Sequence, residues 1–230
     1  AGFASAHWAG RFYAPHAKKG DDQLECYQET FSVVEVNSTF YGTPTADTIA
    51  GWKRRAARGF EFVLKVPKSV THEGGLVSDS ALAALRLFVE RTSGLQPHLA
   101  LLLFQCPRGL CVSPAQLRRL AAELEQLGTR CRVALELRDA GSAADPELLR
   151  LLREQNWALV QHPNSVGRAT ARAGTTGETV HYSPDPLQDT VTADFVYIRL
   201  HGDNDAHTYC FSEAELAGYA EELHRWRARG

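Results

Sequence analysis

Several apolar segments of the chain end in ionisable or amide side chains, and together these side chains offer the chemistry of an anion site. In VVEVN and ALELR, a glutamate and a second polar residue two positions later alternate with valine or leucine. The segments FVLKV, LLLFQ and YIRLH carry polar residues near their ends in the same way. The side chains concerned are Glu35, Asn37, Lys65, Gln105, Glu136, Arg138, Arg199 and His201.

Three permanent cations and two carboxylates meet if these segments lie side by side. Arginine can hold a carboxylate or phosphate through two parallel hydrogen bonds, whereas glutamate and histidine can transfer protons. We predict a catalytic group and a substrate-binding group, namely Glu35, Lys65, Glu136 and His201 for catalysis and Asn37, Gln105, Arg138 and Arg199 for binding. We expect Arg199 to be partly solvated and to wait for ligand. The alternative is a buried ion-pair network that fixes strand register.

Four residues in the expected loops complete the predicted binding group. Trp8 and Tyr13 follow an incomplete strand expected at the start of the chain, and Tyr41 follows the expected strand Val33 to Phe40. At these places aromatic rings can stack on a base or a sugar. His72 follows the expected strand Phe60 to Val66. Packing of the rings against the rim of the sheet, and a solvated loop histidine, are the alternatives.

The sequence also contains residue types that could bind a metal ion or form disulfides. Glu35, Glu136, His72, His162 and His201 are ligand types, but the cations Lys65, Arg138 and Arg199 oppose a bound metal ion. We therefore expect no metal and no cofactor. The five cysteines are scattered and odd in number, which favours reduced thiols and no disulfide.

Apolar runs and helical periodicities alternate along the chain. We predict strands at Val33 to Phe40, Phe60 to Val66, Leu99 to Gln105, Arg132 to Leu137, Trp157 to Gln161 and Phe195 to His201. We predict helices at Asp21 to Gln28, Thr45 to Ala57, Ser80 to Arg91, Pro114 to Leu127, Pro146 to Gln155 and Ser212 to Arg227. The expected helix caps are Thr45, Ser80, Ser113 and Asp145.

This alternation predicts an α/β fold with parallel strands and outer helices, in one domain over residues 1–230. Residues two apart on a strand share a face, so the apolar set can pack on helices while the polar set faces something else. In an open sheet both faces lie under helices, whereas a barrel has a lumen whose mouth accepts polar groups. We therefore predict a TIM-type (β/α) barrel.

The stretches HWAGRFYAP, VVEVNSTFYGTP, FEFVLKVPKSVTHE, LLLFQCP, VALELRD and DFVYIRLHGD occur in this order along the chain. In order and spacing they resemble the YecE-like family, domain of unknown function 72 (DUF72). The resemblance implies a TIM-type barrel and carries no settled activity. Relative to the family pattern, the chain lacks part of the first strand and the last strand and helix, which are expected after Arg229.

Composition limits the function classes. The net charge of −2 disfavours coating of nucleic acid, and the sequence contains neither a signal peptide nor a membrane-length apolar run. We expect a cytoplasmic protein without a membrane partner. The preferred function is an enzyme, of hydrolase or lyase/isomerase type, that acts by acid/base chemistry on a small phosphorylated or carboxylated substrate. A nucleic-acid-binding or phosphodiester-processing module related in fold to endonuclease IV and a non-catalytic scaffold are the alternatives.

Overall fold

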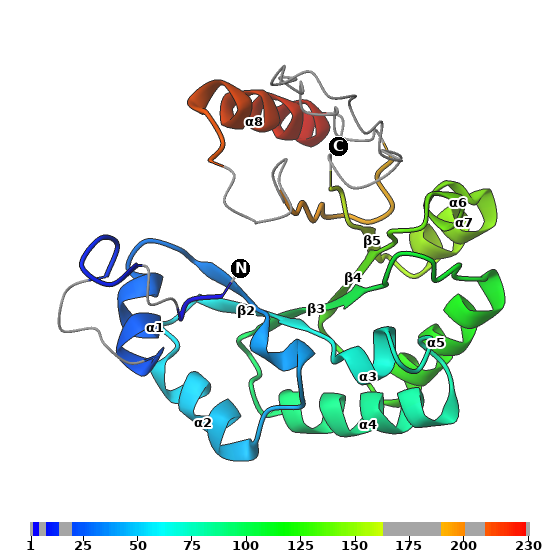
Figure 1. The fold of residues 1–230 in the computed structure, drawn as a ribbon, viewed down its shortest axis with the longest axis horizontal. Helices are drawn as coiled ribbons and strands as arrows, with labels where there is room; N and C mark the ends of the chain where they lie inside the picture. Colours follow the sequence, from blue (N-terminus) through cyan, green and yellow to red (C-terminus); the bar gives the residue numbers. More distant parts are fainter. Residues whose placement is uncertain (1, 5–7, 14–19, 163–189, 201–209, 229–230) are drawn as a thin grey trace, which may run out of the picture.

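The computed structural model describes residues 2–4, 8–13, 20–162, 190–200 and 210–228. Their centre is a five-stranded sheet in which every strand pairs in parallel with the next strand along the chain (Figure 1). The strands are β1 (Val33–Val36), β2 (Glu61–Lys65), β3 (Leu99–Gln105), β4 (Arg132–Glu136) and β5 (Ala158–Leu159). The α/β class and the parallel sheet predicted from sequence are confirmed.

Helices connect the strands, and most begin where a polar side chain caps them. They are α1 (Gly20–Gln28), η2 (Ser38–Phe40), α2 (Ala46–Arg55), α3 (Lys68–Thr71), α4 (Asp79–Ser93), α5 (Pro114–Gln126), α6 (Ala140–Ala144), α7 (Pro146–Glu154) and α8 (Glu213–Ala228). Thr45, Ser113 and Asp145 cap α2, α5 and α7 as predicted. The prediction for Ser80 is wrong, because the Ser78 hydroxyl accepts from the Ala81 amide and α4 starts one residue earlier.

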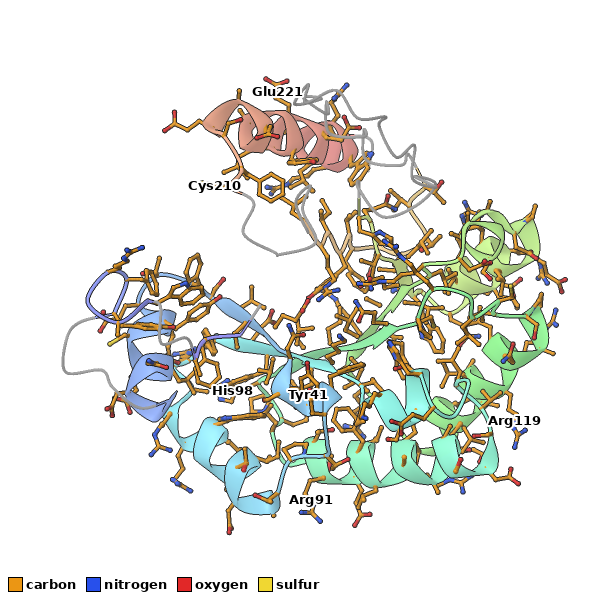
Figure 2. All side chains as sticks on the ribbon, in the orientation of Figure 1. Tyr41, Arg91, His98, Arg119, Cys210 and Glu221 are labelled. Atoms are coloured by element: carbon orange, nitrogen blue, oxygen red, sulfur yellow. The ribbon has the colours of Figure 1, made fainter. Side chains whose placement is uncertain are left out.

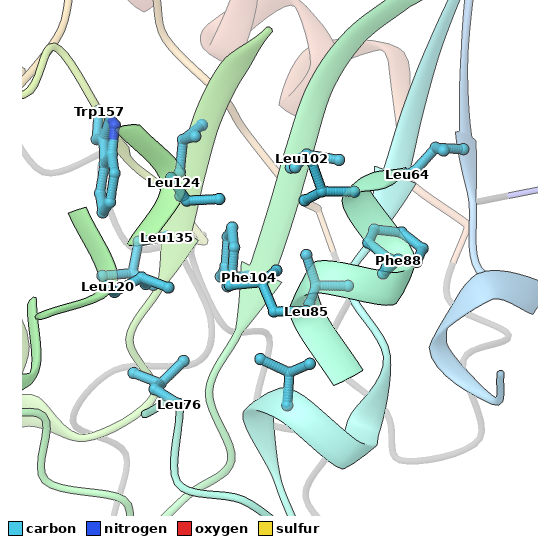
Figure 3. Packing of buried hydrophobic residues seen from close by; sticks show 14 of the residues in the cluster. Leu64, Leu76, Leu85, Phe88, Leu102, Phe104, Leu120, Leu124, Leu135 and Trp157 are labelled. Carbon is cyan, nitrogen blue, oxygen red and sulfur yellow. The ribbon is translucent and has the colours of Figure 1, made fainter. Parts of the chain in front are cut away.

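One face of the sheet forms the main core against the helices. Strand residues such as Leu102, Phe104 and Leu135 interlock with helix residues such as Leu85 and Leu120, all of them buried (Figure 3). Burial of such side chains from water supplies most of the stability of a domain of this size. The predicted alternation is therefore correct on the helix-covered face.

The opposite face carries a smaller apolar layer. Val63, Leu101, Leu103, Ala134 and Val160 form it together with Ala158, and Phe195 and Tyr197 pack against it. This is the face on which a barrel would have its lumen. In the described residues, however, the sheet has five strands and does not close.

The sixth predicted strand, Phe195 to His201, is the clearest departure from the predicted barrel. Its described part forms a single parallel bridge, between Gln161 and Ile198. The amide of Gln161 donates to the carbonyl oxygen of Tyr197, and the amide of Arg199 donates to that of Gln161, both at 2.9 Å. These two bonds extend the sheet locally beyond β5 without building a full strand.

The first strand also ends earlier than predicted. The chain leaves β1 after Val36 and turns into η2, because the Thr39 hydroxyl donates to the carbonyl oxygens of Val36 (3.0 Å) and Lys65 (2.7 Å). Thr39 is buried. This one side chain thus fixes the ends of β1 and β2 against each other, directly beneath Lys65.

Helix α8 lies across the sheet from α2, α4 and α5 (Figure 1). Its buried residues Tyr219 and Trp226 pack with Val196, Ile198 and Leu200, together with Phe211. No helix among the described residues is long and apolar enough to cross a membrane. All five cysteines are free thiols. The single-domain assignment stays a prediction.

Candidate functional site

Glu35, at the third position of β1, faces residues from the far end of the chain. Its two carboxylate oxygens accept hydrogen bonds from Nε and Nη2 of Arg199, at 2.9 and 2.7 Å. The phenol of Tyr197 donates to the same carboxylate at 2.7 Å. A two-point arginine–carboxylate pair of this kind is directional and charge-assisted, so it fixes the orientation of both side chains.

Glu136, the last residue of β4, is 0% exposed and, among the described residues, accepts from the side chains of Gln105, Arg138 and Arg199. Gln105 Nε2 and Arg138 Nε donate to Oε1 at 2.9 and 2.6 Å, and Arg199 Nη1 donates to Oε2 at 2.6 Å. Burial alone would raise the pKa of this carboxyl, but the Arg199 and Arg138 cations outweigh burial and lower the pKa to about 2. Glu136 is therefore ionised at every physiological pH.

Arg199 joins both carboxylates and is itself buried, with a side chain 9% exposed. Burial opposes its charge, but the hydrogen bonds to Glu35 and the charges of Glu35 and Glu136 raise its pKa above the ordinary value. The expectation of a solvated Arg199 that waits for ligand is wrong. Its guanidinium already bridges β1 and β4, as the ion-pair alternative supposed.

Lys65 ends β2 and lies close to these groups without joining them. Its side chain is 8% exposed, and Nζ lies 3.8 Å from the centroid of the Phe40 ring. Among the described residues, Nζ forms no hydrogen bond and no ion pair. Burial, followed by the nearby Arg199 cation, lowers the pKa of Lys65 to about 8, against the opposing effect of Glu136 and Glu35.

Arg138 follows β4 and is more accessible, with a side chain 27% exposed. It uses Nε to bind Glu136, and its two terminal nitrogens form no hydrogen bond with the described residues. A cleft of about 860 Å³ opens here. Its polar lining consists of Glu35, Asn37, Lys65, Gln105, Arg138, Tyr197 and Arg199.

We call Glu35, Lys65, Gln105, Glu136, Arg138 and Arg199 the charged cluster. Its three cations and two carboxylates leave one net positive charge beside the cleft. Asn37 borders the same cleft, and its buried Oδ1 receives no hydrogen bond within the described part of the chain. A buried polar atom without a partner is costly, which makes Asn37 a second unsatisfied group beside the excess positive charge.

The structure separates the predicted aromatic residues from the charged cluster. Trp8 and Tyr13 pack on each other and on Phe12, with ring centroids 5.0 to 5.8 Å apart, and neither residue lines the cleft. Burial raises the pKa of Tyr13 to about 12, and its hydroxyl donates to the carbonyl oxygen of Phe3. These positions agree with the packing alternative.

Tyr41 and His72 both contact the ring of Phe40, which in turn contacts Lys65. Tyr41, labelled in Figure 2, is 77% exposed. It packs edge to face on Phe40. The His72 ring contacts Phe40 at 4.9 Å between centroids, and its Nδ1 lies 2.8 Å from the Thr71 hydroxyl. Partial burial, then the Lys65 cation, lowers the pKa of His72.

Two further histidines were considered from sequence. His201 lies outside the described residues, so its predicted catalytic role stays a prediction. His162 is buried after β5, and burial lowers its pKa. No group of three His, Cys, Asp or Glu side chains within the described ranges is arranged to hold a metal ion.

Sequence reasoning missed two residues of this site. Tyr197 stands two positions before Arg199, so the face alternation used for Arg199 also places Tyr197 beside Glu35. Phe40 was placed in the expected strand Val33 to Phe40 and not beside Lys65, although it forms the surface on which Lys65 rests. Its role depends on the turn that ends β1 early, which the alternation pattern does not signal.

Comparison with known proteins identifies relatives of this chain. A family model described as "Protein of unknown function DUF72" matches residues 1–230. The "UPF0759 protein YecE" of Escherichia coli strain K12 is 28% identical over 119 residues, which are 52% of this chain and 42% of that protein. The match thus spans less than half the length of this curated relative.

Two solved structures share the fold. A DUF72 family protein of Thermotoga maritima MSB8 superposes with a TM-score of 0.70 at 24% identity, covering 99% of this chain and 86% of that chain. A DUF72 family protein of Enterococcus faecalis V583 gives 0.66 at 22% identity, covering 88% and 80%. The resemblance to the DUF72 family that was noted in the sequence is thereby confirmed. The two solved structures support the fold and no particular activity.

Proposed function

Because the chain belongs to the DUF72 family, whose description assigns no function, the activity has to be inferred from the site, and we propose that the cleft binds a small anionic substrate and acts on it by proton transfer. The observation that carries this proposal is the excess positive charge at the cleft. Within the described part of the chain, Arg138 has two uncommitted terminal nitrogens and Lys65 has no carboxylate partner, whereas both glutamates are occupied. An anion supplies the missing negative charge.

The contacts divide the charged cluster into two sets with different tasks. Glu35, Glu136 and Arg199 hold one another, so we assign them to positioning the site. Arg138 faces the cleft and is assigned to the anion. Gln105 and Asn37 line the same cleft, and Asn37 Oδ1, which has no partner among the described residues, can accept a hydrogen bond from a substrate hydroxyl.

Proton transfer falls to Lys65 under this proposal. A carboxyl with a pKa of about 2 is a weak base at neutral pH, which removes Glu136 from that role. Lys65, with a pKa of about 8, has a neutral amine fraction near neutral pH and lies beside the cleft. A proton acceptor of this kind suits the lyase/isomerase type of reaction better than hydrolysis.

Ligand-dependent thermal melting tests the anion site. An anion that binds only the folded chain raises the melting temperature, so we expect millimolar phosphate, citrate or a sugar phosphate to do so at fixed ionic strength. Arg138→Met should abolish the shift. Arg91→Met, on the outer side of α4 (Figure 2), is the matched control and should retain it.

The proposal is abandoned if no anion shifts the parent protein, or if both arginine variants respond alike. A steeply salt-dependent association with DNA or RNA, without any small-anion shift, would instead favour the nucleic-acid alternative.

We also propose that residues 190–200 occupy the place of a further barrel strand. The parallel bridge between Gln161 and Ile198 and the contact of Arg199 with β1 support this arrangement. The side chains of Tyr197 and Arg199 then face a lumen, as predicted for a TIM-type barrel. The cytoplasmic location stays a prediction.

A further inference from the structure

We propose that the Lys65 amine is a nucleophile that forms a Schiff base with an anionic aldehyde or ketone bound at Arg138. This inference rests on the proposed anion site and names its substrate class. The geometry that carries it is a buried lysine at the end of a strand, open to the cleft and without a carboxylate partner in the ranges that the structure describes.

The surroundings of Lys65 hold its amine in place without pairing it with a carboxylate of the described residues. The Thr39 hydroxyl binds the Lys65 carbonyl oxygen at 2.7 Å, which fixes the backbone. Phe40 supports Nζ from below at 3.8 Å, and an aromatic face offers no proton acceptor. The nearest carboxylates are instead bound to arginines, Glu35 to Arg199 and Glu136 to Arg138 and Arg199.

The electrostatics of the cluster act in the same direction. Burial and the Arg199 cation lower the pKa of Lys65 to about 8, whereas an ordinary lysine is almost wholly protonated at neutral pH. Only the neutral amine attacks a carbonyl, and desolvation or a neighbouring cation is a usual means of activating lysine for this reaction. The charged and titratable groups that act on Lys65 or respond to its charge are Arg199, Glu136, Glu35, Arg138 and His72.

The reaction needs no further reagent. The nitrogen lone pair of Lys65 forms a bond to the carbonyl carbon, and the carbonyl π pair moves to oxygen, which takes up a proton. This proton comes from the attacking nitrogen, and a second proton, from solvent, lets the oxygen leave as water while the nitrogen lone pair forms the C=N iminium. Hydrolysis reverses each step. The iminium carries the same single positive charge as a protonated lysine, so the Phe40 face that supports the cation also supports the product.

Borohydride trapping of the whole chain tests the proposal. The protein is incubated with pyruvate or with glyceraldehyde 3-phosphate, reduced with sodium borohydride, and analysed by peptide mass spectrometry. We expect at least one of the two compounds to label Lys65 at least about tenfold faster than Lys68, with the rate rising through about pH 8. Lys68 is the matched control, because it is three residues away, half-exposed and ion-paired with Glu73 at 2.8 Å.

Lys65→Arg keeps the cation over Phe40 and cannot form an imine, so it should fold, as circular dichroism would check, and lose the label. Equal labelling of Lys65 and Lys68, or no label at Lys65 with either compound, overturns the Schiff base. The two proposals remain distinguishable: anions that raise the melting temperature without any trapping leave the anion site standing and refute the imine. Lys65 labelled equally by uncharged glyceraldehyde, without any anion-induced shift, refutes the anion site.

Discussion

Arg199 and Arg138 carry the same formal charge but differ in burial and in their contacts. Arg199 is 9% exposed and bound to Glu35 and Glu136, so its charge is already compensated. Arg138 touches Glu136 with Nε alone and remains open to the cleft. From sequence the two residues were placed in the same binding group, because alternation along a strand gives the face of a residue but not its partners.

Replacement of each arginine should separate these tasks. Arg199→Met leaves two buried carboxylates without their shared cation, and we expect the free energy of unfolding to fall by about 3 to 5 kcal/mol. Arg138→Met removes a partly solvated group, and we expect a loss of about 1 kcal/mol or less. Urea unfolding measures both. A similar loss in the two variants would contradict the division of the cluster.

The lowered pKa of Lys65 makes the free energy of unfolding depend on pH in the alkaline range. Its pKa falls from 10.5 in the unfolded chain to about 8 in the folded protein. Between these values the unfolded state binds more protons, so the free energy of unfolding should rise as pH increases from about 8 toward 10.5. Urea unfolding at pH 8, 9 and 10 should show this rise in the parent protein. Lys65→Met should flatten it, whereas Lys53→Met, on α2, should not.

At the level of elements, the turn after β1 positions the site. Thr39 is buried and joins the last residues of β1 and β2 through its hydroxyl. Thr39→Val keeps the shape of the side chain but leaves two buried carbonyl oxygens without this donor, so we expect unfolding to become easier by about 1 to 3 kcal/mol. Urea unfolding would show this loss.

The control for Thr39 is Thr30→Val, at an exposed position after α1, which should change stability by less than about 0.5 kcal/mol. If the two threonine variants behave alike, Thr39 does not hold the strand ends together. A loss confined to Thr39→Val, accompanied by a weaker anion-induced shift in melting temperature, would connect the turn to the position of Lys65.

The sequence predicted the elements better than their ends. Strong sequence signals identified β3 and α5 within a residue, since Leu99 to Phe104 is uniformly apolar and Ser113-Pro114 marks a helix start. The end of β1 was missed, because it depends on a hydrogen bond from Thr39 to a residue 26 positions away. Capping by Ser78 rather than Ser80 was missed for a related reason: both residue types fit, and only the geometry of the turn decides.

For the candidate site, alternation correctly predicted that Glu35, Glu136 and Arg199 share one face of the sheet. A shift of one residue along a strand would turn its charged side chains into the core and its leucines out of it, which would disrupt the core. The same rule could have identified Tyr197. It could not show which ions pair, since pairing depends on distances across the sheet. Closure of the barrel was likewise inferred only from the polar face of the strands. Such a face does not require closure, and the sheet of the described residues is open.

Across the whole molecule, residues 190–200 join the sheet both through hydrogen bonds of Thr192 beside β5 and through the ion pairs of Arg199. Arg199 reaches Glu35 across 164 positions of sequence. Residues 196–200 in turn support α8 through the packing of Tyr219 and Trp226. The main core between the sheet and α4 and α5 is a separate set of contacts. Loosening the Arg199 pair should therefore release residues 190–200 and α8 before it affects the central strands.

Hydrogen exchange can detect this local opening. In Arg199→Met, we expect the amides of α8 and of residues 190–200 to exchange at least about tenfold faster, because loss of a buried ion pair lowers the cost of opening. The amides of β2 and β3 should respond less, since their side chains pack in the main core. Arg138→Met should leave α8 unchanged. Uniform acceleration in all strands and helices of Arg199→Met would instead mean that Arg199 stabilises one cooperative unit, with α8 as firmly attached as β3.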